Sequence, residues 1–474
     1  MLLRRFYDTK LAQASYLVGC QATGEALIID PNRDIEQYVA AVRAEKMRLA
    51  FVTETHIHAD YLSGSRELAA VSGAKLLLSD EGGEGWRYGF AAADKAVLMK
   101  DGHTFKVGNI VVRALHTPGH TPEHMSFMIT DGAATDRPMG VFTGDFIFVG
   151  DVGRPDLLEK AAGITGTMEA GARQLFRSIQ EFKKLPDYLQ IWPGHGAGSA
   201  CGKALGAVPS STLGYERFAN WALATENEND FVAMVLAGQP EPPTYFARMK
   251  ALNRDGPPAL GGFRTPAKLD AAKLKGALAA GNPVVDIRPT AAFGKSHAEG
   301  AINIPLTAFA RWAGWYLPYD RDIYLIAESE DRAAEAAKAG ALIGLDRVAG
   351  WFPSDAVPGG QSVRQQNIHD VAAELASGSA TVVDVRWQDE WDAGHLPGAR
   401  HVPMSRLRSD LARLDRDKPI VLHCESGSRS NIAAGIAQQM GFKDVRNMTG
   451  GWNAWSAAGL PTTQTATASG AAVL

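Results

Sequence analysis

The chain has 474 residues, more than one hydrophobic core can organise, so we expect two to four domains. Hydrophobic residues make up 46% and charged residues 21%, a globular balance that excludes a wholly disordered chain, a collagen and a coiled coil. Lys and Arg total 48 against 52 Asp and Glu, so the formal net charge is -4. No basic cluster accompanies this balance, which argues against nucleic acid as a partner.

The sequence contains three cysteines, Cys20, Cys201 and Cys424. So few cysteines, and an odd number, give no disulfide framework and fit a reducing compartment. The N-terminal residues lack the apolar core of a signal peptide, and no run of about 18 apolar residues occurs anywhere. We therefore expect a cytoplasmic protein without a membrane partner.

In residues 1–254, short apolar runs alternate with helical patterns. We expect strands at Ser15–Gly19, Ala26–Asp30, Leu49–Thr53, Ala74–Leu78, Ile110–Leu115, Met125–Ile129 and Gly140–Thr143, and helices at Asp34–Lys46 and Met168–Lys183. Residues 255–265 are dense in Gly and Pro, which indicates a linker.

The rest of the chain repeats itself. Pro283–Arg288 (PVVDIR) returns as Thr381–Arg386 (TVVDVR), so that Asp286 recurs 98 residues later as Asp384. A repeat of this length predicts two copies of a small α/β domain rather than a solenoid. We place the copies at 266–356 and 364–462, and a flexible tail at 463–474.

His and Asp residues follow the apolar runs of the first segment. Loops that leave neighbouring strands at one sheet edge can bring such side chains together as metal ligands. A hydrogen-bonded loop residue is the alternative for any one of them, but their ordered succession favours a site. The candidates are His56, His58, Asp60, His120, Asp145 and His195.

These motifs, HIHAD, TPGHT, TGD and GH, resemble the metallo-β-lactamase superfamily over roughly residues 1–250. The resemblance implies an αββα sandwich with metal at one edge of its sheets. The usual motif is HxHxDH, but Tyr61 stands where the last His belongs. Because that His helps to hold the second ion of two-metal members, its loss argues for a single metal.

The resemblance assigns this metal to His56, His120 and Asp145, with His58 nearby. Two His and one carboxylate with open positions form the ligand set of non-haem Fe(II) oxygenases. We therefore expect one Fe(II) per chain, although the spacing alone does not separate iron from zinc.

Residues 150–156 (GDVGRPD) resemble the persulfide dioxygenase branch of the superfamily. We expect Arg154, with His58, Asp60, Tyr61 and His195, to contact the substrate or to support the metal ligands. Cys201 follows His195 by six residues. It is either a small buried residue or a side chain at the mouth of the metal pocket that touches a persulfide.

The second copy contains a sulfur-chemistry motif, His423–Ser430 (HCESGSRS), between an expected strand ending at Leu422 and an expected helix at Asn431–Met440. Cys424 thus opens a loop at a helix N-terminus, where backbone N–H groups favour a thiolate or an anionic sulfur. Arg429 adds a cationic fork.

This motif, with DVR, GHLPGA and GGWNAW, resembles the rhodanese domains over about residues 364–462. The loop from Cys424 to Arg429 is one residue shorter than in the related phosphatases, which favours sulfur over phosphate. The first copy resembles the same domain but has Ala327 opposite Cys424, although Arg332 matches Arg429. We expect it to be inactive, a spacer or docking module.

The fold class is therefore α/β multidomain, a metallo-β-lactamase sandwich followed by two rhodanese-like domains. This order resembles the persulfide dioxygenase–rhodanese fusions of bacterial sulfide detoxification. The resemblance implies that a thiol persulfide, O2 and water give sulfite and the thiol, and that Cys424 passes sulfane sulfur to or from sulfite and thiosulfate. The direction of that transfer and the thiol carrier (glutathione, coenzyme A or a bacillithiol-like thiol) stay open, and we expect a homodimer or homotetramer.

Two other functions remain open. The first is a two-metal thioester hydrolase of glyoxalase II type fused to a sulfurtransferase, against which Tyr61 counts. The second is a non-enzymatic sulfur-relay scaffold, against which the ligand set and the Cys424 loop count. Metal analysis separates the three, because they require one iron, two zinc ions or none.

Overall fold

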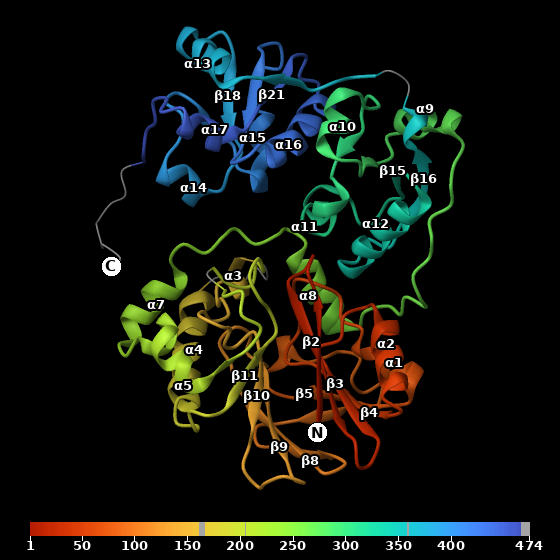
Figure 1. Ribbon diagram of the computed structural model, residues 1–474, viewed down its shortest axis with the longest axis vertical. Coiled ribbons are helices and arrows are strands. Elements are labelled where there is room, and N and C mark those ends of the chain that lie inside the picture. The colour runs from red at the N-terminus through yellow and green to blue at the C-terminus, as the bar shows by residue number, and fades with distance from the viewer. Residues whose placement is uncertain (161–165, 204, 358–359, 466–474) are drawn as a thin grey trace. The chain divides into compact units, whose positions relative to one another are not determined.

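The computed structural model describes residues 1–160, 166–203, 205–357 and 360–465 (Figure 1). The chain forms two compact units, Met1–Phe263 with Ala341–Gly344, and Arg264–Gly340 with Leu345–Leu474. Most of the predicted tail, 466–474, lies outside the described residues. Within the described ranges, no helix is both long enough and apolar enough to cross a membrane.

The first unit contains two six-stranded sheets, each with its strands in chain order. The strands of the first sheet are β1 (Leu2–Asp8), β2 (Gln13–Cys20), β3 (Glu25–Ile29), β4 (Arg48–Thr53), β5 (Lys75–Ser79) and β6 (Val97–Met99). Those of the second are β7 (Thr104–Val107), β8 (Ile110–His116), β9 (Met125–Asp131), β10 (Gly140–Gly144), β11 (Gln190–Pro193) and β12 (Ser211–Thr212).

Helices cover the outer faces of both sheets (Figure 1). Those beside the first sheet are α1 (Ile35–Ala44), α2 (Ser65–Ser72) and the short 3-10 helix η1 (Glu84–Trp86). The later ones are α3 (Leu157–Lys160), α4 (Thr167–Phe182), α5 (Leu213–Ala219), α6 (Trp221–Ala224), α7 (Glu228–Leu236) and α8 (Phe246–Asp255).

Alternating side chains of the strands build three apolar layers. On β2, Leu17 packs toward α1 and α2, whereas Tyr16 and Val18 join Phe127 and Phe142 of the second sheet between the two sheets. This follows from the period of two in a strand, which sends neighbouring side chains to opposite faces. A third cluster joins the second sheet to α4 and α7, so the predicted αββα sandwich is confirmed.

The expected strands and helices of this unit occur within one or two residues of their predicted ends. The prediction missed β1, whose half-exposed residues include two arginines and do not alternate. It also missed α5 to α8, and it began the linker at Asp255, which is the last residue of α8.

The second unit holds two sheets with matching strand order, which confirms the internal repeat. The order is β14-β13-β15-β16 in the first copy and β19-β18-β20-β21 in the second, where β17 is added at the edge. The first sheet consists of β13 (Val284–Asp286), β14 (Ile302–Asn303), β15 (Ile323–Ala327) and β16 (Val348–Pro353). The second consists of β17 (Arg364–Gln366), β18 (Thr381–Asp384), β19 (Arg400–His401), β20 (Ile420–His423) and β21 (Val445–Met448).

The helices of the copies also correspond. The first copy has η2 (Ala271–Lys273), α9 (Leu274–Ala279), α10 (Thr290–Lys295), η3 (Leu306–Ala308), α11 (Phe309–Tyr316), α12 (Glu330–Leu342) and η4 (Ser354–Ala356). The second has α13 (Ile368–Ser377), α14 (Gln388–Ala393), η5 (Met404–Arg406), α15 (Leu407–Leu411), α16 (Ser428–Gln439) and α17 (Gly451–Ala457).

Helix α16 is buried around its whole circumference over residues 430–437. It packs on β20 and β21 of its own domain and on β14 and α10 of the first copy. Asn431 Nδ2 donates to Asn303 Oδ1 across this contact at 3.2 Å. A Cβ at Gly435 would lie 3.1 Å from the ring of Phe293, so the small residue allows the close approach.

Candidate functional site

Four loops of the first unit carry the predicted ligands, and each follows a strand. His56 comes after β4, His120 lies between β8 and β9, Asp145 follows β10, and His195 follows β11. The turn before His120 requires glycine, because Gly119 has φ +143° and a Cβ there would lie 2.4 Å from Cα of Leu175.

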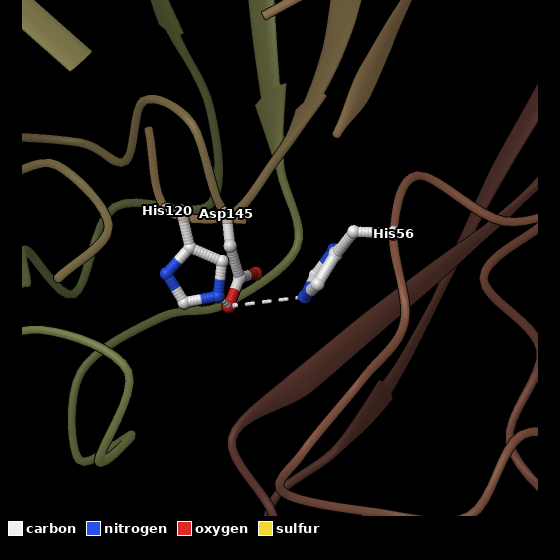
Figure 2. A group of neighbouring side chains, drawn as sticks. All are labelled: His56, His120 and Asp145. Atoms are coloured by element: carbon white, nitrogen blue, oxygen red, sulfur yellow. Dashed lines mark ion pairs between the residues drawn. The ribbon is translucent and has the colours of Figure 1, made fainter. Parts of the chain in front are cut away.

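Three of these side chains, His56, His120 and Asp145, meet in a buried cluster (Figure 2). The Nε2 atoms of His56 and His120 lie 3.8 and 3.5 Å from the same oxygen, Asp145 Oδ2. The exposed fractions of the three residues are 1%, 3% and 0%. The structure thus brings together the three residues that the sequence assigns to one metal.

The outer nitrogen of each imidazole is held by an oxygen. His120 Nδ1 lies 3.0 Å from the backbone oxygen of Arg154, which only accepts, so Nδ1 carries the proton. The Thr55 hydroxyl donates to Asp30 Oδ2 at 2.9 Å and therefore accepts from His56 Nδ1 at 3.0 Å. Both Nε2 atoms consequently present bare lone pairs to the cluster, the tautomer that a metal ligand needs.

The three side chains have the chemistry of a cation site. Among the residues that the structure describes, neither carboxylate oxygen of Asp145 has a hydrogen-bond partner. Burial and neighbouring imidazoles hold the pKa of His56 well below its usual value, and burial lowers the pKa of His120. Two neutral imidazoles and a buried carboxylate that face one another in this way fit a bound metal cation.

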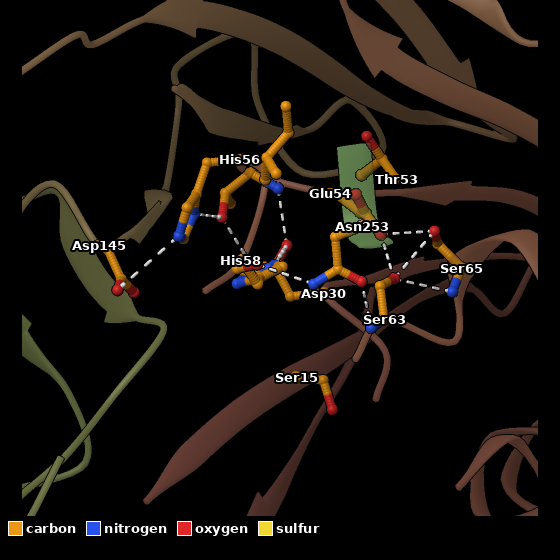
Figure 3. A network of polar contacts seen from close by, with 12 residues as sticks. Ser15, Asp30, Thr53, Glu54, His56, His58, Ser63, Ser65, Asp145 and Asn253 are labelled. Atoms are coloured by element: carbon orange, nitrogen blue, oxygen red, sulfur yellow. Dashed lines mark hydrogen bonds and ion pairs between the residues drawn. The ribbon is translucent and has the colours of Figure 1, made fainter. Parts of the chain in front are cut away.

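His58 lies next to this cluster but faces elsewhere (Figure 3). Its Nε2 is 3.2 Å from Asp30 Oδ1. Burial opposes its charge, but the Asp30 carboxylate outweighs burial and raises the pKa of His58 to about 9. A protonated imidazole has no lone pair for a metal, so this geometry separates His58 from the three ligands.

A buried polar network fixes the loop that carries His56 and His58 (Figure 3). Asn253 Nδ2 donates to the backbone oxygens of His58 and Tyr61, each at 2.8 Å, and its Oδ1 accepts from the Ser63 amide at 3.0 Å. Glu54 accepts from the hydroxyls of Ser63 and Ser65. Because the network ties α8 to the loop, the end of the domain helps to position its first motif.

Tyr61 is buried and is not one of the possible metal ligands. Its ring lies 4.5 Å from that of His58, and its hydroxyl donates to the Asp30 backbone oxygen at 3.4 Å. Burial raises the pKa of Tyr61 well above its usual value, so the phenol remains neutral. It fills space behind His58.

A second cluster of possible ligands lies beside the first: Asp60, His195 and Cys201. His195 Nδ1 donates to the Ala12 backbone oxygen at 3.0 Å, and its Nε2 lies 3.3 Å from Asp60 Oδ2 and 3.5 Å from Asp145 Oδ1. Both oxygens of Asp60 are buried, and neither has a hydrogen-bond partner within the described part of the chain. Asp145 therefore borders both clusters.

Cys201 is only 2% exposed, so it lies inside the site and not at an open mouth. Burial, with the charges of Asp60 and Asp145, raises the pKa of the Cys201 thiol well above its usual value. In the absence of a metal, Cys201 is therefore a neutral thiol at pH 7 and a poor nucleophile.

The family resemblance implies a persulfide substrate. On that basis, Cys201→Ser is expected to lower persulfide turnover about tenfold, because a hydroxyl hydrates more strongly than a thiol. The metal content should stay the same, because the thiol lies outside the His56 cluster. Steady-state kinetics with metal analysis measures both quantities. Cys20→Ser is the matched control, since Cys20 lies at the end of β2 and accepts from the Asn109 amide. Unchanged kinetics in Cys201→Ser would leave Cys201 a packing residue.

Arg154 is fully buried, and its guanidinium is engaged within the protein. It forms a two-bond pair with Asp156 at 2.8 and 2.7 Å and also donates to the backbone oxygens of Ala200 and Pro240. Its own backbone oxygen accepts from His120. The geometry makes Arg154 a support for a ligand, not a side chain that faces the substrate.

Three further buried residues, Asp30, Glu123 and His124, support the site and were not among the predicted site residues. Asp30 orients Thr55 and His58, and Glu123 accepts from the Ile57 amide at 2.8 Å. His124 Nε2 accepts from the Asp145 amide at 3.1 Å. Asp30 could have been predicted from the sequence, because it is a carboxylate that directly follows the apolar strand β3.

The second unit places Cys424 directly after β20, with an exposed fraction of 1%. Its Sγ accepts from the Gly427 amide at 3.2 Å and from the Ser430 hydroxyl at 3.5 Å. Gly427 precedes α16 with φ +104°, a conformation that favours glycine. Cys424 thus opens the predicted loop, whereas Arg429 lies in the first turn of α16, which begins at Ser428, three residues before the expected helix start.

The first copy keeps the same framework without the thiol. Arg288 pairs with Asp286 as Arg386 pairs with Asp384, through three contacts of the same kind in each copy. Ala327 is the buried last residue of β15, where β20 leads into Cys424. A methyl group cannot accept sulfane sulfur, so this copy has no nucleophile at that position.

Two family models match separate parts of this chain. The model described as the metallo-beta-lactamase superfamily matches residues 8–195, and the rhodanese-like domain matches residues 270–350 and 367–458. A solved metallo-beta-lactamase from Staphylococcus aureus subsp. aureus COL is 45% identical with a TM-score of 0.69, covering 74% of this chain and 99% of that one. The chain belongs to the metallo-beta-lactamase superfamily.

Two curated proteins are similar to part of this chain. A probable metallo-hydrolase of Burkholderia pseudomallei (strain 1710b) is 30% identical over 220 residues, covering 41% of this chain and 72% of that protein. The mitochondrial persulfide dioxygenase ETHE1 of Bos taurus is 29% identical over 198 residues, covering 41% of this chain and 68% of that enzyme. The predicted order, a superfamily domain related to persulfide dioxygenases followed by two rhodanese-like domains, is confirmed.

Proposed function

We propose that the first unit oxidises a low-molecular-weight thiol persulfide with O2. In the balanced reaction RSSH, O2 and water give RSH, sulfite and two protons. The observation that carries the proposal is the convergence of two neutral imidazoles on the unpartnered Asp145 carboxylate. This is the ligand set of mononuclear Fe(II) oxygenases, and a persulfide dioxygenase is among the relatives.

The residues of the site have separate tasks in this proposal. His56, His120 and Asp145 would hold one Fe(II), which when bound supplies the chemistry that O2 requires. Thr55 and the Arg154 backbone oxygen keep the two imidazoles in the ligating tautomer. The buried Asp60, His195 and Cys201 would border the persulfide and keep bulk water away.

The last domain would carry sulfane sulfur on Cys424. The Cys424 thiolate attacks the terminal sulfur of RSS⁻, so a Cys–S–S⁻ group forms and RS⁻ leaves. Transfer of that sulfur to sulfite then yields thiosulfate and restores the thiolate, and the reverse sequence starts from thiosulfate. No external oxidant or reductant is needed.

Metal analysis of the full chain, purified without added metal, tests the proposal. We expect one iron per chain together with O2 uptake that depends on persulfide. Two zinc ions with thioester hydrolysis would support a hydrolase instead, and protein without metal or turnover would support a sulfur-relay scaffold.

A two-metal thioester hydrolase is the second candidate, and a specific observation favours it. Although Tyr61 replaces the usual His, Cys201 lies beside Asp60 and His195, so three ligand types suitable for a second cation are present. The metallo-hydrolase relative agrees with this reading. The metal stoichiometry decides between one site and two.

We further propose a cytoplasmic role in sulfide detoxification, with a homodimer or homotetramer as the working form. The substrate would be the persulfide of glutathione, coenzyme A or a bacillithiol-like thiol. Turnover with each persulfide identifies the carrier, and light scattering gives the oligomeric state.

A further inference from the structure

Glu390, which was not among the predicted site residues, binds Arg429 in the first turn of α16, next to the Cys424 loop. Its two carboxylate oxygens accept from the two terminal nitrogens of Arg429, at 2.6 and 2.5 Å. Glu390 also accepts from the Trp387 amide at 2.9 Å, which fixes the carboxylate at the start of α14. Such a two-bond pair is the strongest geometry available to these side chains.

The inactive copy provides an internal comparison, because it has Ala292 at the position of Glu390, 98 residues earlier. Its local fold is nevertheless retained: the Phe293 and His297 rings stack at 9°, as the Trp391 and His395 rings do. The fold therefore does not need a carboxylate here. The first copy, which lacks the nucleophile, therefore also lacks a carboxylate that could pair with Arg332, the counterpart of Arg429, in the way that Glu390 pairs with Arg429.

Arg332, the counterpart of Arg429, shows the consequence. It is exposed and donates to Glu335 three residues further along its own helix, at 3.2 Å. Without a carboxylate at position 292, the arginine turns to a partner on α12. Glu390 accordingly belongs to the Cys424 site and not to the general rhodanese-like framework.

The pairing also changes the charge near the sulfur. Burial disfavours the charged form of Glu390, but the hydrogen bonds and charge of Arg429 outweigh it and lower the pKa of Glu390. Glu390 is therefore ionised at neutral pH and compensates Arg429. Cys424 Sγ accepts hydrogen bonds from an amide and a hydroxyl, which are neutral donors, and the charged group that interacts with Cys424 is Arg429.

We propose that Glu390 is a positioning residue that sets the selectivity for sulfur donors. Its carboxylate partly neutralises the charge of Arg429, so that the Cys424 site favours singly charged sulfur donors over doubly charged ones. This inference rests on the proposed sulfur transfer. A thiol persulfide brings one negative charge to Cys424, whereas thiosulfate brings two. An arginine paired with a carboxylate attracts the second negative charge of a donor less strongly than an unpaired arginine does.

Glu390→Gln tests this selectivity in the full chain. The variant should raise kcat/KM for thiosulfate, relative to that for glutathione persulfide, by about tenfold through a lower KM, and the effect should shrink at high salt. Glu390→Asp keeps the charge and should return the ratio to near the wild-type value. Asp389→Asn removes one charge from the neighbouring exposed residue and should leave the ratio unchanged.

A second measurement works even if the chain transfers no sulfur. Alkylation of Cys424 by iodoacetate, an anion, is compared with alkylation by neutral iodoacetamide, and peptide mapping identifies the modified cysteine. Glu390→Gln should raise the iodoacetate-to-iodoacetamide rate ratio several-fold. If both ratios stay at wild-type values, Glu390 has only a structural role; if wild type lacks transfer while the alkylation ratio still rises, only the proposed function fails.

Discussion

Replacement of His120 by alanine is expected to remove the metal and to abolish persulfide-dependent O2 uptake. His120 supplies one of two bare imidazole nitrogens near Asp145 Oδ2, at 3.5 Å. Without it, one imidazole and one carboxylate remain, too few ligands to retain a metal against solvent. Loss of a residue that only supports a metal ligand costs up to about a hundredfold in activity. Loss of the ligand itself should therefore lower activity by more than that.

Iron content by mass spectrometry and O2 uptake by electrode measure the two effects. His103→Ala is the control, since His103 lies between β6 and β7 and outside both ligand clusters. Circular dichroism checks folding, because alanine leaves the Arg154 backbone oxygen without its donor. Full oxygen consumption by a folded His120→Ala protein would overturn the ligand assignment.

Cys424→Ser is expected to erase sulfur transfer while O2 uptake continues. A hydroxyl fills nearly the same space as a thiol but cannot form a persulfide, so transfer should fall by more than about a thousandfold. Cys424 Sγ accepts from Gly427 and Ser430, and Cys424 and the His120 cluster belong to different units of the chain. The product should therefore change, from thiosulfate in the wild type to sulfite in the variant.

Separate measurement of thiosulfate, sulfite and O2 distinguishes the possible outcomes. Cys20→Ser makes the same chemical change far along the chain and should leave all three unaltered. Thiosulfate made by Cys424→Ser at the wild-type rate, without added sulfite, would contradict the coupled scheme. Loss of O2 uptake together with transfer would mean that one active site serves both reactions.

The sequence predicted those features that depend on local pattern. Buried strands such as β3 and β8 read as apolar runs, and the His and Asp side chains follow them because strand ends open into loops. The two-copy architecture was readable because Asp286 and Asp384 stand in the same short motif. Half-exposed β1 had no such pattern.

The features that were missed depend on contacts between distant segments. Nothing around Asn253 indicates that it binds the loop at His58, 195 residues away. Tyr61 suggested the loss of a second metal site, yet the structure places Cys201 beside Asp60 and His195. Glu390 was the exception, because aligning the copies sets it against Ala292 and marks it as a residue lost with the thiol.

The burial of α16 on all sides makes the stability of the last domain depend on the first copy. One side of α16, the helix that follows the Cys424 loop, packs against Asn303 and Phe293 of the first copy. Mutations that unfold the first copy would expose α16 and are therefore expected to destabilise the last domain. A fragment designed to carry Cys424 should accordingly begin near Arg264 and include both copies, because the last domain alone would leave this face of α16 exposed.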